Sequence, residues 1–266
     1  MVISNRQFPS IYYQKFGSGP AIVLLHGFPE SGVLWKDVWP ALAEQYTVIV
    51  PDLPGSGKSA RGNDAISIEA LAGSVAAVLE AEQVDQALLA GHSMGGYIAL
   101  AFAALYSSKL AGLSMVHSTA YADDEEKKNN RKKAIELIRK GGKEPFIKQM
   151  IPALFSPRTK ETLPGIIERQ VESGLKLEAE SMIAYYQAML ERPDRIGLVA
   201  NAAFPMQWII GKDDSVISFT KGLQQCTLAY TNFVSVYNMC GHMSMLENKD
   251  GLVFDLLDFA AYCFWS

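Results

Sequence analysis

The stretch GHSMGG, residues 91 to 96, places one serine between glycines, directly after a run of small apolar residues. A strand that ends at Gly91 and a helix that begins near Met94 would form a very sharp turn. Gly91 and Gly95 lack the Cβ atoms that would collide where the backbone doubles back. The turn pushes the hydroxyl of Ser93 clear of the chain, and the helix amino terminus offers free N–H groups to negative charge. The pattern predicts a nucleophilic serine.

A serine hydroxyl needs a histidine to take its proton and a carboxylate to hold that histidine. Of the four histidines, His242 lies late in the chain in the loop CGHMSM, after the apolar run NFVSVY. We interpret His117, at a predicted strand end, as a hydrogen-bonded core histidine. The loop GKDDSVIS offers Asp213 and Asp214 as the acid, although either could instead cap the helix that follows.

Acyl transfer also needs donors for the negatively charged oxygen of the tetrahedral intermediate. The backbone amide of Met94, the residue after the serine, is one expected donor. The segment HGF, which follows the apolar run AIVLL, offers the amide of Phe28 as the second. Gly27 would let this backbone approach closely. We therefore predict an oxyanion hole made by the amides of Phe28 and Met94.

Six short apolar runs bounded by turn residues are predicted to be strands, and most lack the alternation of a strand with one exposed face. They are AIVLLH from residue 21, YTVIV from 46, ALLAG from 87, GLSMVH from 112, MQWIIG from 206 and NFVSVY from 232. Segments with apolar residues at helical spacing separate them, namely WKDVWPALAEQ, ISIEALAGSVAAVLEAEQ, GYIALAFAALYSS and GLVFDLLDFAAYCF. This alternation predicts an α/β fold with a mostly parallel central sheet flanked by helices.

Residues 120–204 interrupt this alternation, because they show helical patterns and no convincing strand. We predict a helical cap there, over the carboxyl ends of the strands, and a core formed by residues 1–119 and 205–266. Within the cap, the segment ESMIAYYQAML places two methionines and two tyrosines on one helix face. We interpret that face as packing against the core.

Composition excludes several classes of protein. The 266 residues carry a formal net charge of −4, so the basic surface of a nucleic-acid binder is not expected. Three cysteines without a C-x-x-C pair predict neither disulfides nor a zinc site. No window reaches the roughly 18 apolar residues of a membrane span, and the amino terminus lacks an export signal, so we predict a cytoplasmic protein without membrane contact. A chain whose leader had been removed would look the same.

Five segments together resemble the α/β-hydrolase superfamily: HGFPES, DLPGSGKS, GHSMGG, GKDDSV and GHMSMLE. The resemblance extends from about Tyr12 to the carboxyl terminus and implies the α/β-hydrolase fold with a helical cap. The superfamily's G-x-x-D pattern maps Gly211 onto Asp214, which favours Asp214 over Asp213 as the acid. His242 matches the superfamily's histidine.

The segment HGFPES is similar to the oxyanion segment of epoxide hydrolases and of dehalogenases in the same superfamily. Those enzymes carry an aspartate at the turn where this chain has Ser93. A serine does not form their alkyl-enzyme ester but does form an acyl-enzyme. The sequence therefore argues against epoxide or halide chemistry, and we interpret Tyr185 and Tyr186 as packing residues of the cap.

The resemblance and the residues together predict a serine hydrolase that cleaves a small carboxylic ester. Ser93 would be the nucleophile, His242 the base, Asp214 the residue that orients it, and the amides of Phe28 and Met94 the oxyanion donors. The expected partners are a small apolar acyl substrate and water, with no cofactor and no metal. Three alternatives stay open: a carbon-carbon bond hydrolase, a perhydrolase, and a ligand receptor that turns over slowly or not at all. The sequence leaves the oligomeric state open.

Overall fold

The strands of the described chain form one eight-stranded sheet in the order β1-β2-β4-β3-β5-β6-β7-β8. This computed structural model describes residues 1–62 and 65–265. β1 and β2 run antiparallel to their neighbours, and β3 to β8 run parallel to one another. The strands are β1 (Val2–Ile3), β2 (Ile11–Phe16), β3 (Ala21–Leu25), β4 (Thr47–Pro51), β5 (Ala87–His92), β6 (Leu110–Val116), β7 (Met206–Gly211) and β8 (Asn232–Tyr237).

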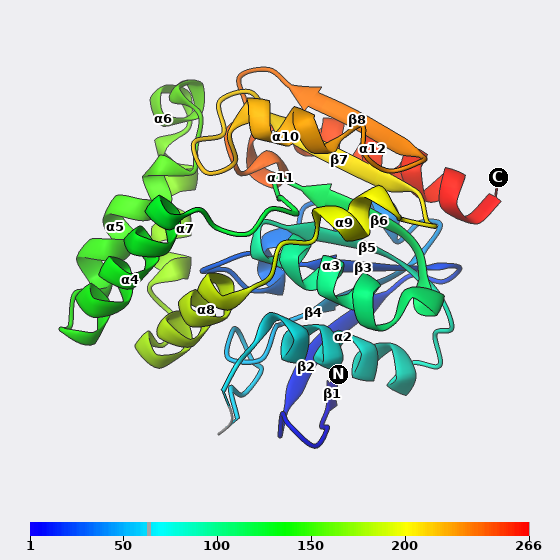
Figure 1. Cartoon of the computed structure of the whole chain (residues 1–266), viewed down its shortest axis with the longest axis horizontal. Helices are drawn as coiled ribbons and strands as arrows, with labels where there is room; N and C mark the ends of the chain where they lie inside the picture. The colour runs from blue at the N-terminus through cyan, green and yellow to red at the C-terminus, as the bar shows by residue number, and fades with distance from the viewer. Residues whose placement is uncertain (63–64, 266) are drawn as a thin grey trace.

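Helices cover both faces of this sheet (Figure 1). α3 packs against β5, β6 and α2, and α12 packs against β6 and α1. The helical elements of this part are η1 (Gly32–Trp35), α1 (Trp39–Leu42), α2 (Ile68–Ala81), α3 (Met94–Leu105), η2 (Ser107–Lys109), α10 (Phe219–Gln225), α11 (Ser244–Glu247) and α12 (Lys249–Trp265). The architecture confirms the predicted α/β fold with a mostly parallel sheet flanked by helices.

The six apolar runs form β3 to β8, and every residue of β3, β4, β5 and β7 is buried. β8 differs, because it is the edge strand and exposes Val234 and Val236. One predicted helix was wrong in its extent. WKDVWPALAEQ forms the end of η1 and the four-residue α1, which begins just before Pro40. Proline lacks the amide hydrogen that a helix interior uses, which favours a helix start at this point over one continuous helix.

Between β6 and β7, the described chain contains helices and no strand. They are α4 (Glu125–Arg139), α5 (Lys143–Ala153), α6 (Pro157–Thr162), α7 (Pro164–Gly174), α8 (Ala179–Glu191) and α9 (Ile196–Ala200). α4 to α7 gather at one side of the molecule (left in Figure 1). Asp124 caps the start of α4 by accepting from the amide of Lys127, and Gly141 follows its end with a φ of +87°. None of the described helices has the length and apolarity needed to cross a membrane.

Candidate active site

Ser93 lies between β5 and α3 in a backbone conformation that L-amino acids rarely adopt. Its φ is 52° and its ψ is −113°, and such strain persists only where the surroundings enforce it. A Cβ on Gly91 would lie 2.4 Å from the carbonyl oxygen of Gly95, and one on Gly95 would lie 2.5 Å from that of Leu25. Both glycines are therefore required for the turn. The turn leaves Ser93 half-buried at the amino terminus of α3.

The loop after β3 lies against this turn. A Cβ on Gly27 would come within 3.1 Å of the Cβ of Ser93. Within the described chain, the backbone amides of Phe28 and Met94 have no hydrogen-bond acceptor. Free amides next to a serine hydroxyl are suited to hold the negative oxygen of a tetrahedral intermediate. The oxyanion hole itself stays a prediction.

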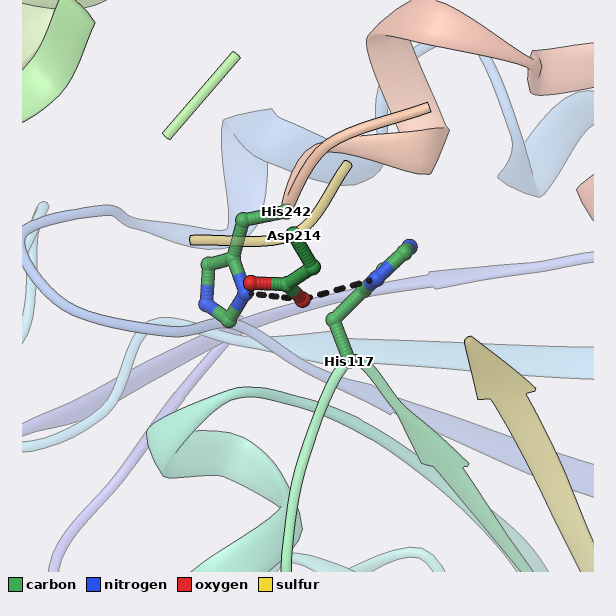
Figure 2. Close-up of side chains that lie close together, drawn as sticks. All are labelled: His117, Asp214 and His242. Atoms are coloured by element: carbon green, nitrogen blue, oxygen red, sulfur yellow. Dashed lines mark hydrogen bonds and ion pairs between the residues drawn. The ribbon is translucent and has the colours of Figure 1, made fainter. Parts of the chain in front are cut away.

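Asp214 and His242 are hydrogen-bonded to each other, and both side chains are buried (Figure 2). Since a carboxylate can only accept, Nδ1 of His242 donates to Oδ2 of Asp214, at 2.8 Å. The other carboxylate oxygen accepts from the amides of Val216 and Ile217. Burial would raise the pKa of Asp214, but His242 and His117 outweigh burial and hold this pKa well below its ordinary value. Asp213, the alternative acid, is exposed.

The loop that carries His242 is held from three sides. Its backbone amide donates to the carbonyl oxygen of Leu154 at 2.7 Å. Nε2 of His92 donates to the carbonyl oxygen of His242 at 2.9 Å. The carboxylate of Glu247 accepts from the amide of Gly241 at 2.7 Å. These contacts fix the position of the imidazole, and the motif GHMSMLE contains the glutamate that helps to fix it.

The structure brings the segments of Ser93 and His242 together but does not join their side chains. His92, the neighbour of Ser93, has its ring centroid 4.9 Å from that of His242. Within the described residues, no hydrogen bond links Oγ of Ser93 to Nε2 of His242. Catalytic hydrogen bonds are often long without substrate and tighten when it binds. The serine-histidine contact therefore stays a prediction.

His117 is a member of this cluster that the sequence did not indicate. Its Nδ1 lies 3.3 Å from Oδ2 of Asp214, the oxygen that also accepts from His242 (Figure 2). The nitrogen and oxygen atoms of these three residues lie within 4.8 Å of one another, a spacing also found around metal ions. Both Nδ1 atoms already serve as donors to the carboxylate, so we assign hydrogen bonds and no metal to the cluster. The prediction that His117 is a hydrogen-bonded core histidine was incomplete, since its Nε2 is buried without a partner in the described chain.

Comparisons with known proteins bear on the fold of the chain. The sequence profile of the alpha/beta hydrolase fold matches residues 20–140. A solved esterase from Thermogutta terrifontis, with malate bound, superimposes with a TM-score of 0.94 and is 28% identical, over 99% of this chain and 98% of that one. Together, the profile match and the structural similarity support an α/β-hydrolase superfamily member.

Curated relatives in this superfamily differ in their activities. The pimeloyl-[acyl-carrier protein] methyl ester esterase of Aeromonas hydrophila is 40% identical over 111 residues, which is 41% of this chain and 42% of that protein. The soluble epoxide hydrolase of Corynebacterium sp. is 41% identical over 93 residues, which is 35% of this chain and 32% of that protein. The chain therefore aligns with less than half the length of either relative. These matches support a hydrolase, and its specificity must be argued from the site.

α8 lies over the loop that carries Phe28. The ring of Tyr186 meets the ring of Phe28 edge-on, with 4.7 Å between their centroids. The hydroxyl of Tyr185 donates to the carbonyl oxygen of Pro54 at 2.7 Å. Both tyrosines are buried, as expected for packing residues. The contact of Tyr186 places α8 directly above one of the two candidate oxyanion donors.

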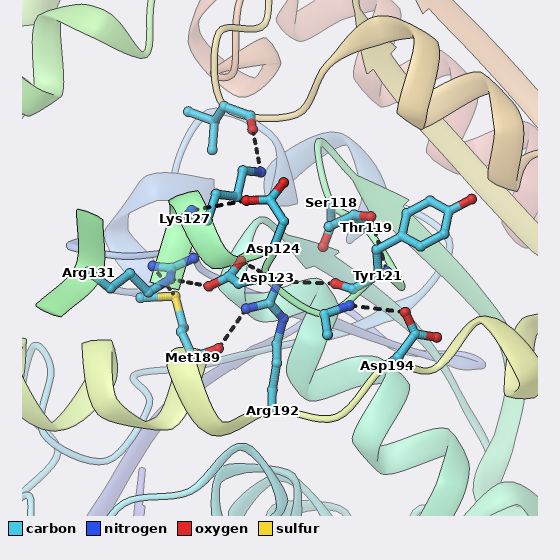
Figure 3. Close-up of polar contacts among 12 residues, drawn as sticks. Ser118, Thr119, Tyr121, Asp123, Asp124, Lys127, Arg131, Met189, Arg192 and Asp194 are labelled. Carbon is cyan, nitrogen blue, oxygen red and sulfur yellow. Dashed lines mark hydrogen bonds and ion pairs between the residues drawn. The ribbon is translucent and has the colours of Figure 1, made fainter. Parts of the chain in front are cut away.

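A buried ionic cluster fixes α4 and α8 to the segment that leaves β6 (Figure 3). The carboxylate of Asp123 accepts from Nε of Arg131 on α4 and, at 2.8 Å, from Nη2 of Arg192 at the end of α8. Arg192 also donates to the carbonyl oxygens of Met189 and Tyr121, at 2.6 and 3.1 Å. One carboxylate thus holds two guanidinium groups, so the position of α8 depends on Asp123.

Glu30, two residues after Phe28, is a buried carboxyl without a cation. Its side chain borders a cavity of about 550 Å³ between the loops after β3 and β4 and helices α7 and α8, which neither Ser93 nor His242 lines. Oε1 has no hydrogen-bond partner within the described chain. Burial raises the pKa of Glu30 from its ordinary value of 4.5 to about 8.

Replacing Glu30 with glutamine should therefore stabilise the fold at alkaline pH. A raised pKa stabilises the folded state fully below pH 4.5, and this contribution is lost as the pH rises through about 8. We expect Glu30→Gln to raise the free energy of unfolding by up to about 5 kcal/mol at pH 9 and to leave it unchanged at pH 4.5. Urea unfolding followed by tryptophan fluorescence measures this. Glu80→Gln, on the exposed side of α2, is the control. Equal effects of Glu30→Gln at both pH values would contradict the prediction.

Proposed function

We propose that this protein is a serine hydrolase that cleaves small carboxylic esters through an acyl-enzyme on Ser93. The observation that carries the proposal is the enforced backbone of Ser93, at φ 52° and ψ −113°, beside two amides without acceptors. A helix that merely begins with glycines and catalyses no reaction would not need a serine held in this strained backbone conformation. The similarity over nearly the whole chain to the Thermogutta esterase supports ester substrates.

In the first half of the reaction, Oγ of Ser93 attacks the ester carbonyl carbon and His242 takes its proton. The amides of Phe28 and Met94 hold the negative oxygen of the intermediate. Collapse of this intermediate releases the alcohol, which takes its proton from His242 and leaves the acyl group on Ser93. Asp214 keeps the imidazole oriented and stabilises its charged form throughout.

Water completes the cycle. His242 removes a proton from the water molecule, whose oxygen attacks the acyl carbon. The acid leaves, and the proton returns to Oγ of Ser93. We propose that residues 120–204 act as a cap over this site, since Tyr186 of α8 packs on Phe28. The apolar rings there favour a small apolar acyl group, and no step calls for a cofactor.

Serine at the turn separates this proposal from epoxide hydrolysis, despite the similarity to the Corynebacterium epoxide hydrolase. Epoxide opening through an enzyme ester needs a carboxylate nucleophile, because water must later attack that ester at its acyl carbon. Ser93 offers a hydroxyl instead. The similarity to the epoxide hydrolase therefore supports a fold and an oxyanion loop common to both proteins. The serine nucleophile favours ester substrates for this chain.

A fluorophosphonate probe tests the proposal directly. We expect one equivalent of probe to bind the folded protein, and peptide mapping to place it on Ser93, because only an activated serine displaces the fluoride. Heat-denatured protein is the control and should remain unlabelled. Rates of hydrolysis are then compared for p-nitrophenyl acetate, styrene oxide and a vinylogous diketone. This comparison identifies which of the three bonds the enzyme cleaves. Labelling at another residue, or none at all, would overturn the proposed function.

A further inference from the structure

The carboxylate that orients His242 has a second histidine bonded to it. Nδ1 of His117 donates to Oδ2 of Asp214 at 3.3 Å, and Nδ1 of His242 donates to the same oxygen at 2.8 Å (Figure 2). His117 follows β6, which lies between the strands that lead to Ser93 and Asp214. Its ring is 1% exposed, so this contact is shielded from water.

Keeping a histidine at this position costs free energy. Its Nε2 is buried without a hydrogen-bond partner among the described residues. His117 has a φ of +48°, a conformation that histidine and asparagine adopt more readily than apolar residues do. Asparagine would therefore also fit this backbone. What the histidine adds is the N–H group that it directs at Asp214.

We propose that His117 is a positioning residue that fixes the Asp214 carboxylate and limits how strongly this carboxylate stabilises protonated His242. The inference rests on the proposed serine hydrolase function. His242 has to accept a proton from the serine and return it, so an acid partner that stabilised the imidazolium too strongly would keep the base protonated. A second donor on Oδ2 shares the negative charge of Asp214 between two rings. His117 thereby extends the activity to lower pH.

Few other titratable groups near His117, Asp214 and His242 could change the pH dependence of the activity. The titratable groups that face it are His92 of β5, His117 after β6, Asp214 after β7, Cys240 in the loop of His242, and Glu247 of α11. Burial lowers the pKa of His92 and of His117, so both rings are neutral near pH 7. Burial raises the pKa of the Cys240 thiol, which stays protonated. Neutral His117 must carry its hydrogen on Nδ1 to donate to Asp214.

Two kinds of variant separate the N–H donor from the volume of the ring. His117→Asn places an amide N–H where Nδ1 was, and asparagine tolerates positive φ. His117→Leu retains bulk and removes the donor. Because an apolar side chain is strained at this φ, His117→Gly is a second variant without the donor. The rate of fluorophosphonate labelling of Ser93 and kcat/KM for p-nitrophenyl acetate are each measured from pH 4 to pH 9.

We expect the acidic limb of both profiles to move upward by about half a pH unit in His117→Leu and His117→Gly, and to return to the wild-type position in His117→Asn. At pH values on the acidic side of this limb, a shift of about half a pH unit makes the reaction of the variant about threefold slower than that of wild type. Profiles of the variants without the donor that coincide with wild type would overturn the inference, as would an equal shift in His117→Asn. Failure of wild-type protein to be labelled would instead overturn the proposed function. The two failures are therefore distinguishable.

Discussion

Ser93→Ala should lower kcat/KM for p-nitrophenyl acetate by on the order of 10⁵-fold while leaving the fold intact. The variant removes only the hydroxyl oxygen, so His242 loses the group whose proton it takes and no acyl-enzyme can form. The remaining amides and the bound water would still supply a small rate above that of the uncatalysed reaction. The backbone conformation at this position is enforced by its neighbours, chiefly Gly91 and Gly95, and alanine needs no more space than serine.

The measurement is a steady-state rate on purified protein, with thermal unfolding by circular dichroism to verify the fold. Ser107→Ala is the matched control, because Ser107 is an exposed serine in η2. It should leave the rate unchanged. A rate for Ser93→Ala within tenfold of wild type, with the same Tm, would show that another group is the nucleophile.

Much of the sheet was predictable because its strands are short, apolar and buried on both faces. β3, β4, β5 and β7 have no exposed residue, so each reads as an uninterrupted apolar run. β2 escaped prediction, because its sequence IYYQKF mixes polar and aromatic residues on an antiparallel strand. A sequence with this pattern can be recognised as a strand only when its pairing with β4 is known.

The candidate site residues were predicted mainly from their residue type and from their position directly after a strand. Their spacing along the chain was less informative. Asp214 and His242 follow β7 and β8, and parallel neighbouring strands carry their following loops to the same edge of the sheet. The same argument applies to His117 at the end of β6, between β5 and β7. No sequence rule, however, predicts that its ring turns toward Asp214, which is 97 positions away.

The buried ionic cluster around Asp123 could not be predicted, because it depends on how α4 and the end of α8 pack around the segment after β6. Arg131 is 8 positions from Asp123, and Arg192 is 69 positions away. Most charged side chains of α4 are exposed. Arg131 differs, since it points inward and its guanidinium lies over the ring of Tyr186, 5.3 Å from its centroid. Only the packing of α4 against α8 distinguishes it from its neighbours.

Asp123→Asn should destabilise the protein by about 3–5 kcal/mol at pH 7, because it leaves two buried guanidinium groups without their carboxylate. The Arg131 side chain is 17% exposed and that of Arg192 is 3% exposed, so water cannot replace the lost charge at Arg192. Burial would raise the pKa of Asp123, but the two arginines outweigh burial and lower it from 3.8 to about 2. A lowered pKa stabilises the fold above pH 3.8, and this contribution is lost as the pH falls through about 2.

The neighbouring Asp124→Asn provides a control with the same chemical change. Asp124 caps α4 and meets Lys221 at 3.1 Å on the surface, and asparagine caps a helix about as well, so little stability should be lost. Urea unfolding at pH 7 compares the two variants with wild type. Because Arg192 closes the end of α8, and Tyr186 of the same helix covers Phe28, we also expect Asp123→Asn to raise KM for the ester more than it lowers kcat. The Arg192 guanidinium also lies over the ring of Tyr97, 3.9 Å from its centroid. Similar stabilities of the two variants would mean that the rings of Tyr186 and Tyr97, and not Asp123, stabilise the two arginines.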